Sequence, residues 1–176
     1  MSRLIILAGL PGTGKTTLAR KLSKKLDYFY LRVDCIEAPF SVYNPKAGEN
    51  GEGYEALINL AYENLVLGHN LIIDTVNPLH ISRKMFNQLK EKTETATVQF
   101  ELKIKNSELH KSRVENRKSD VNGLEIPTWK NVTEREYEEW EQELDGKRFE
   151  IWTDDMESAF ETCLKIISEE LTNINE

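Results

Sequence analysis

The residues best suited to chemistry lie near the start of the chain, where residues 9–16 read Gly-Leu-Pro-Gly-Thr-Gly-Lys-Thr. This is the Gly-x-x-x-x-Gly-Lys-Thr pattern of a phosphate-binding loop, whose glycines let backbone N–H groups turn inward around phosphate oxygens. Such a loop uses Lys15 to reach the β- and γ-phosphates and the hydroxyl of Thr16 to hold Mg²⁺. The pattern therefore predicts a site for a nucleoside triphosphate. The residues expected to contact it are Gly9, Pro11, Gly12, Thr13, Gly14, Lys15, Thr16 and Thr17.

The elements that flank this loop are the ones its chemistry requires. Residues 3–8 contain four consecutive apolar side chains, as expected of a buried strand. After the loop, Leu18, Ala19, Leu22 and Leu26 recur with the period of a helix. The positive end of that helix would face the phosphates. A chance glycine-rich turn would not carry both elements, so we discount that alternative.

Two aspartates end predicted strands. Asp74 follows the apolar run 71–73, which is the pattern of the carboxylate that binds Mg²⁺ opposite a phosphate loop. Asp34 ends the run 29–33, and carboxyl ends of parallel strands meet at one edge of a sheet. We expect Asp34 to orient or deprotonate an acceptor hydroxyl. The alternative for each residue is an ordinary aspartate that caps a turn or a helix.

Arginines supply the positive charge that phosphoryl transfer needs. Arg113 and Arg117 are one helical turn apart and directly precede the irregular stretch 119–132. We expect this pair to close over the γ-phosphate as part of a lid, although a solvated basic face would show the same pattern. Arg83 is a further candidate for contact with the substrate, with a surface salt bridge as its alternative.

Composition limits the classes of function. The 176 residues suggest one domain, and 39% hydrophobic with 30% charged residues is normal for a globular protein. The net charge of −7 argues against nucleic acid as a partner. We expect no signal peptide and no membrane span, because no apolar run approaches about 20 residues. The two cysteines lie far apart, which favours a reduced, cytoplasmic protein with free thiols.

The chain alternates strand and helix patterns, which predicts an α/β fold with helices on both faces of a parallel sheet. The stretch 38–53 is rich in turn residues and is expected to be a binding loop. In the fourth strand apolar and polar residues alternate, which predicts a face that is only partly covered. The expected strands are 3–8, 29–33, 71–73, 97–104 and 148–152, and the expected helices are 15–26, 54–67, 78–92, 106–118, 133–144 and 156–171.

Several later motifs carry a resemblance to a known family. The chain resembles small-molecule kinases with a phosphate-binding loop: the shikimate, gluconate, adenylate and chloramphenicol kinases and the polynucleotide 5′-hydroxyl kinases. It is more similar to a set of uncharacterised bacterial proteins described as AAA-type ATPases or predicted kinases. The motifs that carry this resemblance are 31–37, 74–78, 110–117, Asp120, Gly123, 127–129 and 135–140.

The resemblance implies a three-layer P-loop NTPase fold with a five-stranded parallel sheet in the order 2-3-1-4-5. It implies one kinase domain over residues 1–176, with a mobile lid at about 106–132. It supports Asp34 as the acceptor-side carboxylate and Arg113 and Arg117 as lid arginines. One position departs from the polynucleotide kinases, which carry an arginine where this chain has Glu37. An acidic residue there would repel a phosphate and accept hydrogen bonds from hydroxyls or an amine.

The sequence therefore predicts a kinase that transfers the γ-phosphate of ATP to a hydroxyl of a small polar molecule. Two alternatives remain: a kinase of polynucleotide 5′-hydroxyls, and a partner-regulated ATPase without an acceptor. The expected cofactors are ATP and Mg²⁺. The predicted catalytic residues are Lys15, Asp34, Arg113 and Arg117; the metal ligands are Thr16 and Asp74; the acceptor contacts are Asp34, Glu37 and Arg83.

Overall fold

A parallel sheet forms the centre of the protein. The computed structural model describes residues 1–43 and 51–172, and all structural statements concern these residues. The strands are β1 (Arg3–Ala8), β2 (Phe29–Arg32), β3 (Leu71–Asp74), β4 (Ala96–Lys103) and β5 (Phe149–Trp152). They pair in parallel in the order β2-β3-β1-β4-β5, which confirms the predicted fold class.

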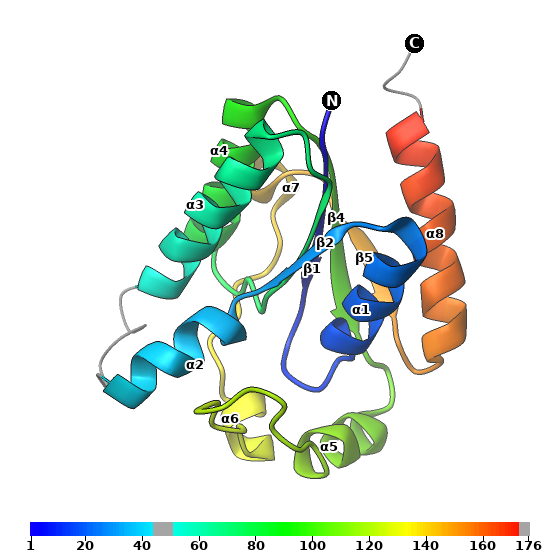
Figure 1. The fold of residues 1–176 in the computed structure, drawn as a ribbon. Coiled ribbons are helices and arrows are strands. Elements are labelled where there is room, and N and C mark those ends of the chain that lie inside the picture. Colours follow the sequence, from blue (N-terminus) through cyan, green and yellow to red (C-terminus); the bar gives the residue numbers. More distant parts are fainter. Residues whose placement is uncertain (44–50, 173–176) are drawn as a thin grey trace.

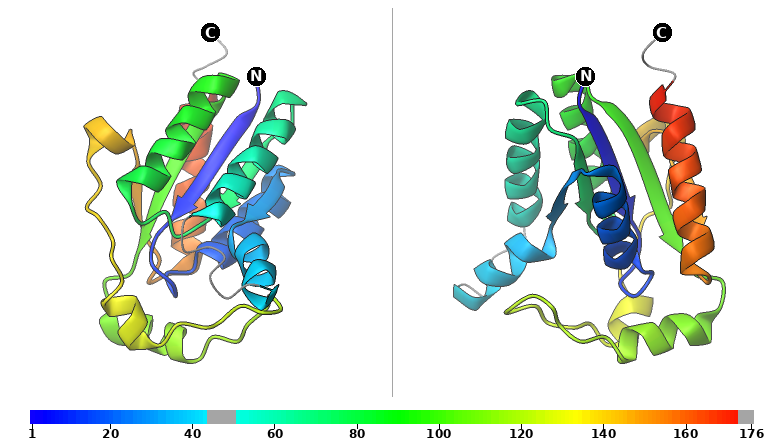
Figure 2. Two further views of the ribbon diagram at one scale, coloured as in Figure 1. Left: turned by 90° about the vertical axis from the view of Figure 1, so that its left-hand side faces the viewer. Right: turned by 45° about the vertical axis from the view of Figure 1, so that its right-hand side comes forward.

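Helices cover both faces of this sheet (Figure 1). On one face lie α1 (Lys15–Leu26) and α8 (Met156–Thr172), and on the other lie α3 (Glu52–Val66), α4 (His80–Thr93) and the short α7 (Gln142–Asp145). The carboxyl ends of the strands point toward α2 (Asp34–Tyr43), α5 (Ser107–Glu115) and α6 (Trp129–Thr133). Figure 2 shows α5, α6 and the chain between them crossing below this edge, opposite the N-terminus.

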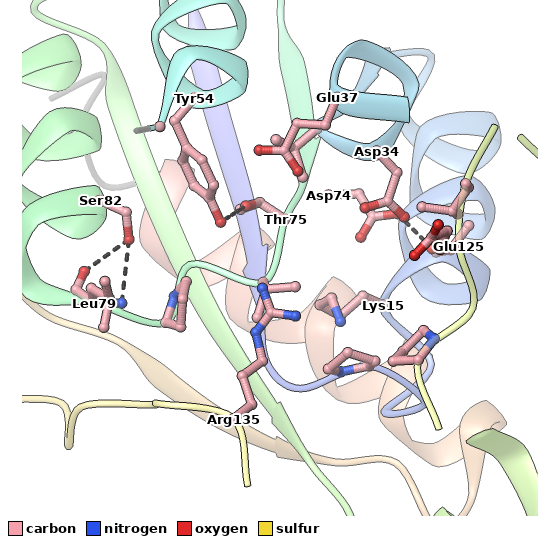
Figure 3. A pocket seen from close by; sticks show the side chains of 18 of the residues that line it. Lys15, Asp34, Glu37, Tyr54, Asp74, Thr75, Leu79, Ser82, Glu125 and Arg135 are labelled. Carbon is pink, nitrogen blue, oxygen red and sulfur yellow. Dashed lines mark hydrogen bonds between the residues drawn. The ribbon is translucent and has the colours of Figure 1, made fainter. Parts of the chain in front are cut away.

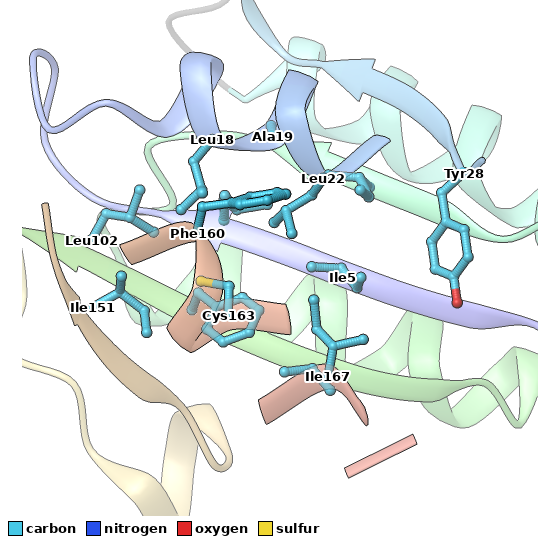
Figure 4. Packing of buried hydrophobic residues seen from close by; sticks show 14 of the residues in the cluster. Ile5, Leu18, Ala19, Leu22, Tyr28, Leu102, Ile151, Phe160, Cys163 and Ile167 are labelled. Carbon is cyan, nitrogen blue, oxygen red and sulfur yellow. The ribbon is translucent and has the colours of Figure 1, made fainter. Parts of the chain in front are cut away.

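Each face of the sheet has its own hydrophobic core. In β1 successive buried side chains alternate between the two cores, with Ile5 and Leu7 on the α1–α8 side and Leu4 and Ile6 on the α3–α4 side. Figure 4 shows the first core, where Leu22 of α1 and other apolar side chains pack between α1, α8 and the strands. Each fully buried leucine or isoleucine contributes roughly 1.5–3 kcal/mol relative to an exposed one. These cores hold the loop between β1 and α1 in place.

The prediction that one face of β4 is only partly covered is wrong for the middle of the strand. Gln99 and Glu101 are 5% and 4% exposed, whereas Thr97 and Lys103, at the two ends of the same face, are only partly buried. The chain around α7 and β5 covers these two side chains: Gln99 Nε2 donates to the carbonyl of Asp145, and Arg148 Nε donates to Glu101 Oε2 at 2.6 Å. Polar side chains alternate with apolar ones in β4 because they bind a neighbouring segment.

Several predicted helix boundaries also differ: the helix expected over 106–118 ends at Glu115, before Arg117, and the helix expected from residue 54 begins at Glu52. Residues 38–43 belong to α2, which contains Pro39, whereas 44–50 of the expected binding loop lie outside the described residues. The helix expected from residue 78 begins at His80, because the backbone of Leu79 is extended and this residue is the N-cap.

The helix expected over 133–144 does not form. Residue 133 instead ends α6, whose capping box pairs Thr128 with Asn131. Backbone groups of the following segment bind distant partners: Glu138 N donates to the carbonyl of Pro78, and the carbonyls of Glu138 and Glu139 accept from Arg83. These contacts replace the hydrogen bonds that a helix would make. No helix among the described residues is long and apolar enough to cross a membrane.

Candidate active site

The phosphate-binding loop connects β1 to α1 as predicted. Gly9, Gly12 and Gly14 all have positive φ values, of 134°, 84° and 89°. Space is limiting as well, because a Cβ atom on Gly12 would lie 2.5 Å from Cγ2 of Val114 in α5. Glycine is therefore required both for the turn of the loop and for the close approach of the lid helix.

Lys15 lies in the centre of the site and is only 8% exposed. Its Nζ donates to the carbonyl of Leu10 at 2.9 Å. Burial lowers the pKa of Lys15 to about 8, and the negative charges of Asp74 and Asp34 oppose that shift. A phosphate at this position would supply the counter-charge that the ammonium group lacks.

Thr16 and Asp74, the two predicted metal ligands, are in contact. Thr16 Oγ1 donates to Asp74 Oδ2 at 2.7 Å. Tyr30 also donates its hydroxyl to the same oxygen at 2.8 Å, and burial raises the pKa of Tyr30, which keeps it a donor. A hydroxyl and a carboxylate in contact are hard oxygen ligands that suit Mg²⁺, which takes few protein ligands and completes its shell with phosphate and water. Tyr30 was not predicted from the sequence.

Asp34 is the first residue of α2 and faces the same site. Its Oδ2 accepts hydrogen bonds from Arg32 Nη2 at 2.6 Å and Nε at 3.0 Å, and from Arg117 Nη2 at 3.5 Å. The Arg32 side chain is 1% exposed and also donates to both carboxylate oxygens of Asp120, at 2.9 and 3.0 Å. Arg32 therefore fixes the orientation of Asp34 and joins it to the lid.

Arg113 lies on α5 and Arg117 just beyond its end. Arg113 donates to the carbonyl of Thr153 at 2.9 Å, beside Gly14, and Arg117 reaches Asp34. A cavity of about 620 Å³ opens here along the phosphate loop and α1. Its basic lining consists of Lys15, Arg20, Arg32, Arg113, Arg117 and Lys118.

A larger cavity of about 870 Å³ lies on the other side of Lys15, between α2, α3, the start of α4 and the lid (Figure 3). Asp34, Glu37 and Asp74 bring carboxylates into it, and Arg117 and Arg135 bring positive charge. Its apolar lining consists of Val33, Val76, Leu79, Ile81, Met85, Leu124 and Ile126.

Glu37 lies one turn after Asp34 in α2 and faces this cavity (Figure 3). Burial, with the negative charge of Asp34 as the next cause, raises the pKa of Glu37 to about 7. Cys35, between them in sequence, is exposed, and partial burial raises its pKa. Cys163 is buried in the α8 core with its pKa raised to about 12, and both cysteines are free.

The prediction that Arg83 contacts the substrate is wrong. Its side chain is fully buried and pairs with the equally buried Asp145 at 2.9 Å, so the surface salt bridge is excluded as well. Its other nitrogens donate to the carbonyls of Asn77, Pro78 and Glu138, and the Trp140 ring lies 4.6 Å away. Arg83 therefore binds α4 to the segment before β5, outside either cavity.

Comparison with known proteins agrees with this geometry. An AAA domain family model matches residues 4–143. The chain belongs to this family. Its fold is that of P-loop kinases, which confirms the resemblance drawn from the motifs. Among curated proteins, none matches the sequence.

Solved structures with similar folds cover nearly the whole chain. A putative kinase from Chloroflexus aurantiacus superposes with a TM-score of 0.74 at 17% identity, covering 96% of this chain and 98% of its own. Kti12 from Chaetomium thermophilum, in complex with ADP-AlF3, superposes with a TM-score of 0.71 at 25% identity, covering 95% of this chain and 98% of its own. A gluconokinase from Sinorhizobium meliloti superposes with a TM-score of 0.68 at 13% identity, covering 98% of this chain and 95% of its own.

Proposed function

We propose that this protein binds ATP with Mg²⁺ and transfers the γ-phosphate to a hydroxyl group of a small polar molecule. The observation that carries the proposal is the meeting of two cavities at the phosphate loop. Lys15, Thr16 and Arg117 line both the 620 Å³ cavity along α1 and the 870 Å³ cavity beyond it. A nucleotide in the first cavity would direct its terminal phosphate toward an acceptor in the second, which is what transfer between two bound reactants requires.

Each residue of the site has a task in this reaction. The loop amides and Lys15 bind the phosphates, while Arg113 and Arg117 bring positive charge from the lid. Thr16 and Asp74 would hold Mg²⁺, which neutralises charge on the phosphate oxygens when bound. The acceptor oxygen forms a bond to the γ-phosphorus, the bond between that phosphorus and the bridging oxygen breaks, and ADP leaves. Asp34 accepts the hydrogen bond of the acceptor hydroxyl and takes its proton.

Turnover of ATP to ADP against a panel of acceptors tests the proposal. The panel would hold nucleosides, sugars, amino alcohols, hydroxylated antibiotics and 5′-hydroxyl oligonucleotides. We expect one class of small molecules to stimulate turnover, and Lys15→Ala to abolish the stimulation. Stimulation by oligonucleotides alone, or slow turnover indifferent to every acceptor, would contradict the proposal.

Asp34→Asn separates binding from transfer. The amide retains the size of the carboxylate but cannot take the proton, so we expect ATP affinity within about twofold of wild type and transfer reduced by about 10²-fold or more. Asp27→Asn is the matched control, because Asp27 is exposed at the end of α1, in a left-handed conformation that asparagine tolerates. Full transfer by Asp34→Asn would show that Asp34 does not have this role.

A further inference from the structure

Two opposite charges enter the larger cavity from different elements. Glu37 comes from α2, and Arg135 comes from the segment that follows α6. Figure 3 shows the two side chains extending into the cavity from different walls. Each influences the other, since the positive charge of Arg135 acts to lower the pKa of Glu37, but they do not form an ion pair.

Within the described residues, neither the partly buried Glu37 nor the exposed Arg135 has a hydrogen-bond or ion-pair partner. Of the three cationic side chains that line the cavity, Lys15 donates to the carbonyl of Leu10 and Arg117 pairs with Asp34. Arg135 makes no ion pair or hydrogen bond within the described part of the chain. Among the carboxylates, Asp34 and Asp74 accept several hydrogen bonds. Glu37 accepts none from the described residues.

The environment of Glu37 makes its lack of a partner costly. It is partly buried, whereas the other glutamates of the cavity, Glu55 and Glu125, are exposed and solvated. The raised pKa reflects this burial. A buried carboxylate without hydrogen bonds is destabilised until a donor or a cation reaches it. A ligand that supplies a cation here would therefore gain affinity.

We propose that the acceptor is a hydroxyl-bearing zwitterion, with its cationic amine on Glu37 and its anionic group on Arg135. This inference rests on the proposed kinase function and names its substrate class. Asp34 lies one helical turn from Glu37, so the hydroxyl that takes the phosphoryl group lies a few bonds from the amine. The apolar residues of the wall, such as Ile81 and Met85, accommodate the carbon skeleton. A neutral polyol would leave the partly buried Glu37 without a cation and the exposed Arg135 with water alone.

Four acceptors that share one scaffold test this inference. Serine carries both charges, ethanolamine only the amine, 3-hydroxypropanoate only the carboxylate, and ethylene glycol neither. The same set on a larger skeleton is 2-amino-2-deoxygluconate, glucosamine, gluconate and glucose. Each charge-assisted contact should raise kcat/KM for transfer about tenfold or more. On at least one scaffold, we expect kcat/KM to be higher for the zwitterion than for both singly charged acceptors, and lowest for the neutral acceptor.

Two variants assign the charges to their residues. Glu37→Gln should raise KM about tenfold for acceptors that carry the amine and leave the acid-only acceptor unchanged. Arg135→Gln should raise KM about tenfold for acceptors that carry the carboxylate and leave the amine-only acceptor unchanged. The KM for ATP should not change in either variant. Lys130→Gln and Glu63→Gln are matched controls, because both residues are exposed and lie outside the cavity lining.

The outcomes distinguish this inference from the function on which it rests. Equal transfer to neutral and zwitterionic acceptors, dependent on Lys15, would overturn the inference and retain the kinase. A loss in Arg135→Gln that is the same for every acceptor and extends to ATP would assign Arg135 to the nucleotide and also overturn it. Absence of transfer to any acceptor would remove the kinase proposal itself.

Discussion

Asp34 and Glu37 are two carboxylates one turn apart in α2 that have different surroundings. Asp34 accepts hydrogen bonds from the nearly fully buried Arg32, whereas Glu37 is partly buried without such a partner. When two neighbouring carboxylates have such different surroundings, they commonly have different roles in a site. Here Arg32 orients Asp34, while Glu37 is left available to a ligand.

The pKa of Glu37 makes the stability of the unliganded protein depend on pH. The folded value is about 7, above the ordinary 4.5, so the folded state holds a proton more tightly than the unfolded state. Stability therefore falls as pH rises from about 4.5 to about 7 and is constant for this group above that. Glu37→Gln removes the effect, so it should be more stable than wild type by about 1–3 kcal/mol at pH 8 and equal to it near pH 4.

Urea unfolding at the two pH values measures this difference. The exposed Glu63→Gln should show no such dependence on pH. If the difference in stability between Glu37→Gln and wild type were the same at both pH values, Glu37 would not have the raised pKa that its burial implies.

At the residue scale, the sequence brings a candidate residue to the predicted edge of the sheet when a local pattern defines its position. Lys15 and Thr16 lie within one contiguous motif, Asp74 ends β3, and Asp34 begins α2 directly after β2, at the same edge of the sheet. Arg32 and Arg135 were not assigned roles, and Arg83 was assigned a wrong one. The reason is that their environments depend on distant residues: Arg32 meets Asp120, and Arg83 meets Asp145 62 positions away. No local pattern contains such pairs.

The lid segment between α5 and α6 is held to the core at Asp120. Its carboxylate accepts hydrogen bonds from Arg20 of α1 and Arg32 of β2. Both hydrogen bonds are strong because Asp120 is negatively charged. In Asp120→Asn they should be weaker, so the segment should detach from the core more often. We expect trypsin to cleave after Lys118 several-fold faster than in wild type.

Gel analysis of the cleavage products measures that rate. Glu115→Gln is the control, since Glu115 forms only an exposed pair with Lys111. Equal cleavage rates for Asp120→Asn and wild type would mean that other contacts hold the lid. One candidate is the hydrogen bond of 2.8 Å between His110 Nε2 and the carbonyl of Pro11.

The buried ion pair between Arg83 and Asp145 joins α4 to the segment before β5. Arg83→Ala would remove the arginine that pairs with the fully buried Asp145, which would keep its hydrogen bonds with His80 and the Glu141 amide, at a cost of about 3–5 kcal/mol in the free energy of unfolding. Denaturant unfolding measures this loss, and Lys84→Ala, an exposed neighbour in the same helix, should change stability by less than about 0.5 kcal/mol. A folded Arg83→Ala variant with stability near wild type but weak acceptor binding would restore the substrate role.

At the element scale, strands and most helices follow from hydrophobic periodicity. The failures occur where backbone groups are bound by distant partners. Residues 134–141 have the pattern of a helix, but their carbonyls accept from Arg83, and Glu138 N donates to Pro78. The alternation in β4 was likewise misread, because a later segment covers its polar face.

For the whole molecule, the phosphate loop joins both cores, so a ligand bound there should stabilise the entire fold. At about 100 times its Kd, a ligand specific for the folded state adds about 2.7 kcal/mol. For a chain of 176 residues this raises Tm by about 5–10 °C. We expect Mg-ATP to produce this shift in thermal unfolding. Lys15→Ala should abolish it, and a shift that persists in that variant would mean that the nucleotide binds elsewhere.

The placement of the two thiols gives this protein a built-in attachment point. Cys163 is closed off within the α8 core, while Cys35 is exposed and adjacent to Asp34 in α2. A maleimide dye added to the native protein would therefore attach at one position, beside the proposed acceptor cavity. Since the pKa of Cys35 is raised, mildly alkaline buffer would speed the coupling. Fluorescence from that single label would report occupancy of the cavity without any engineered residue.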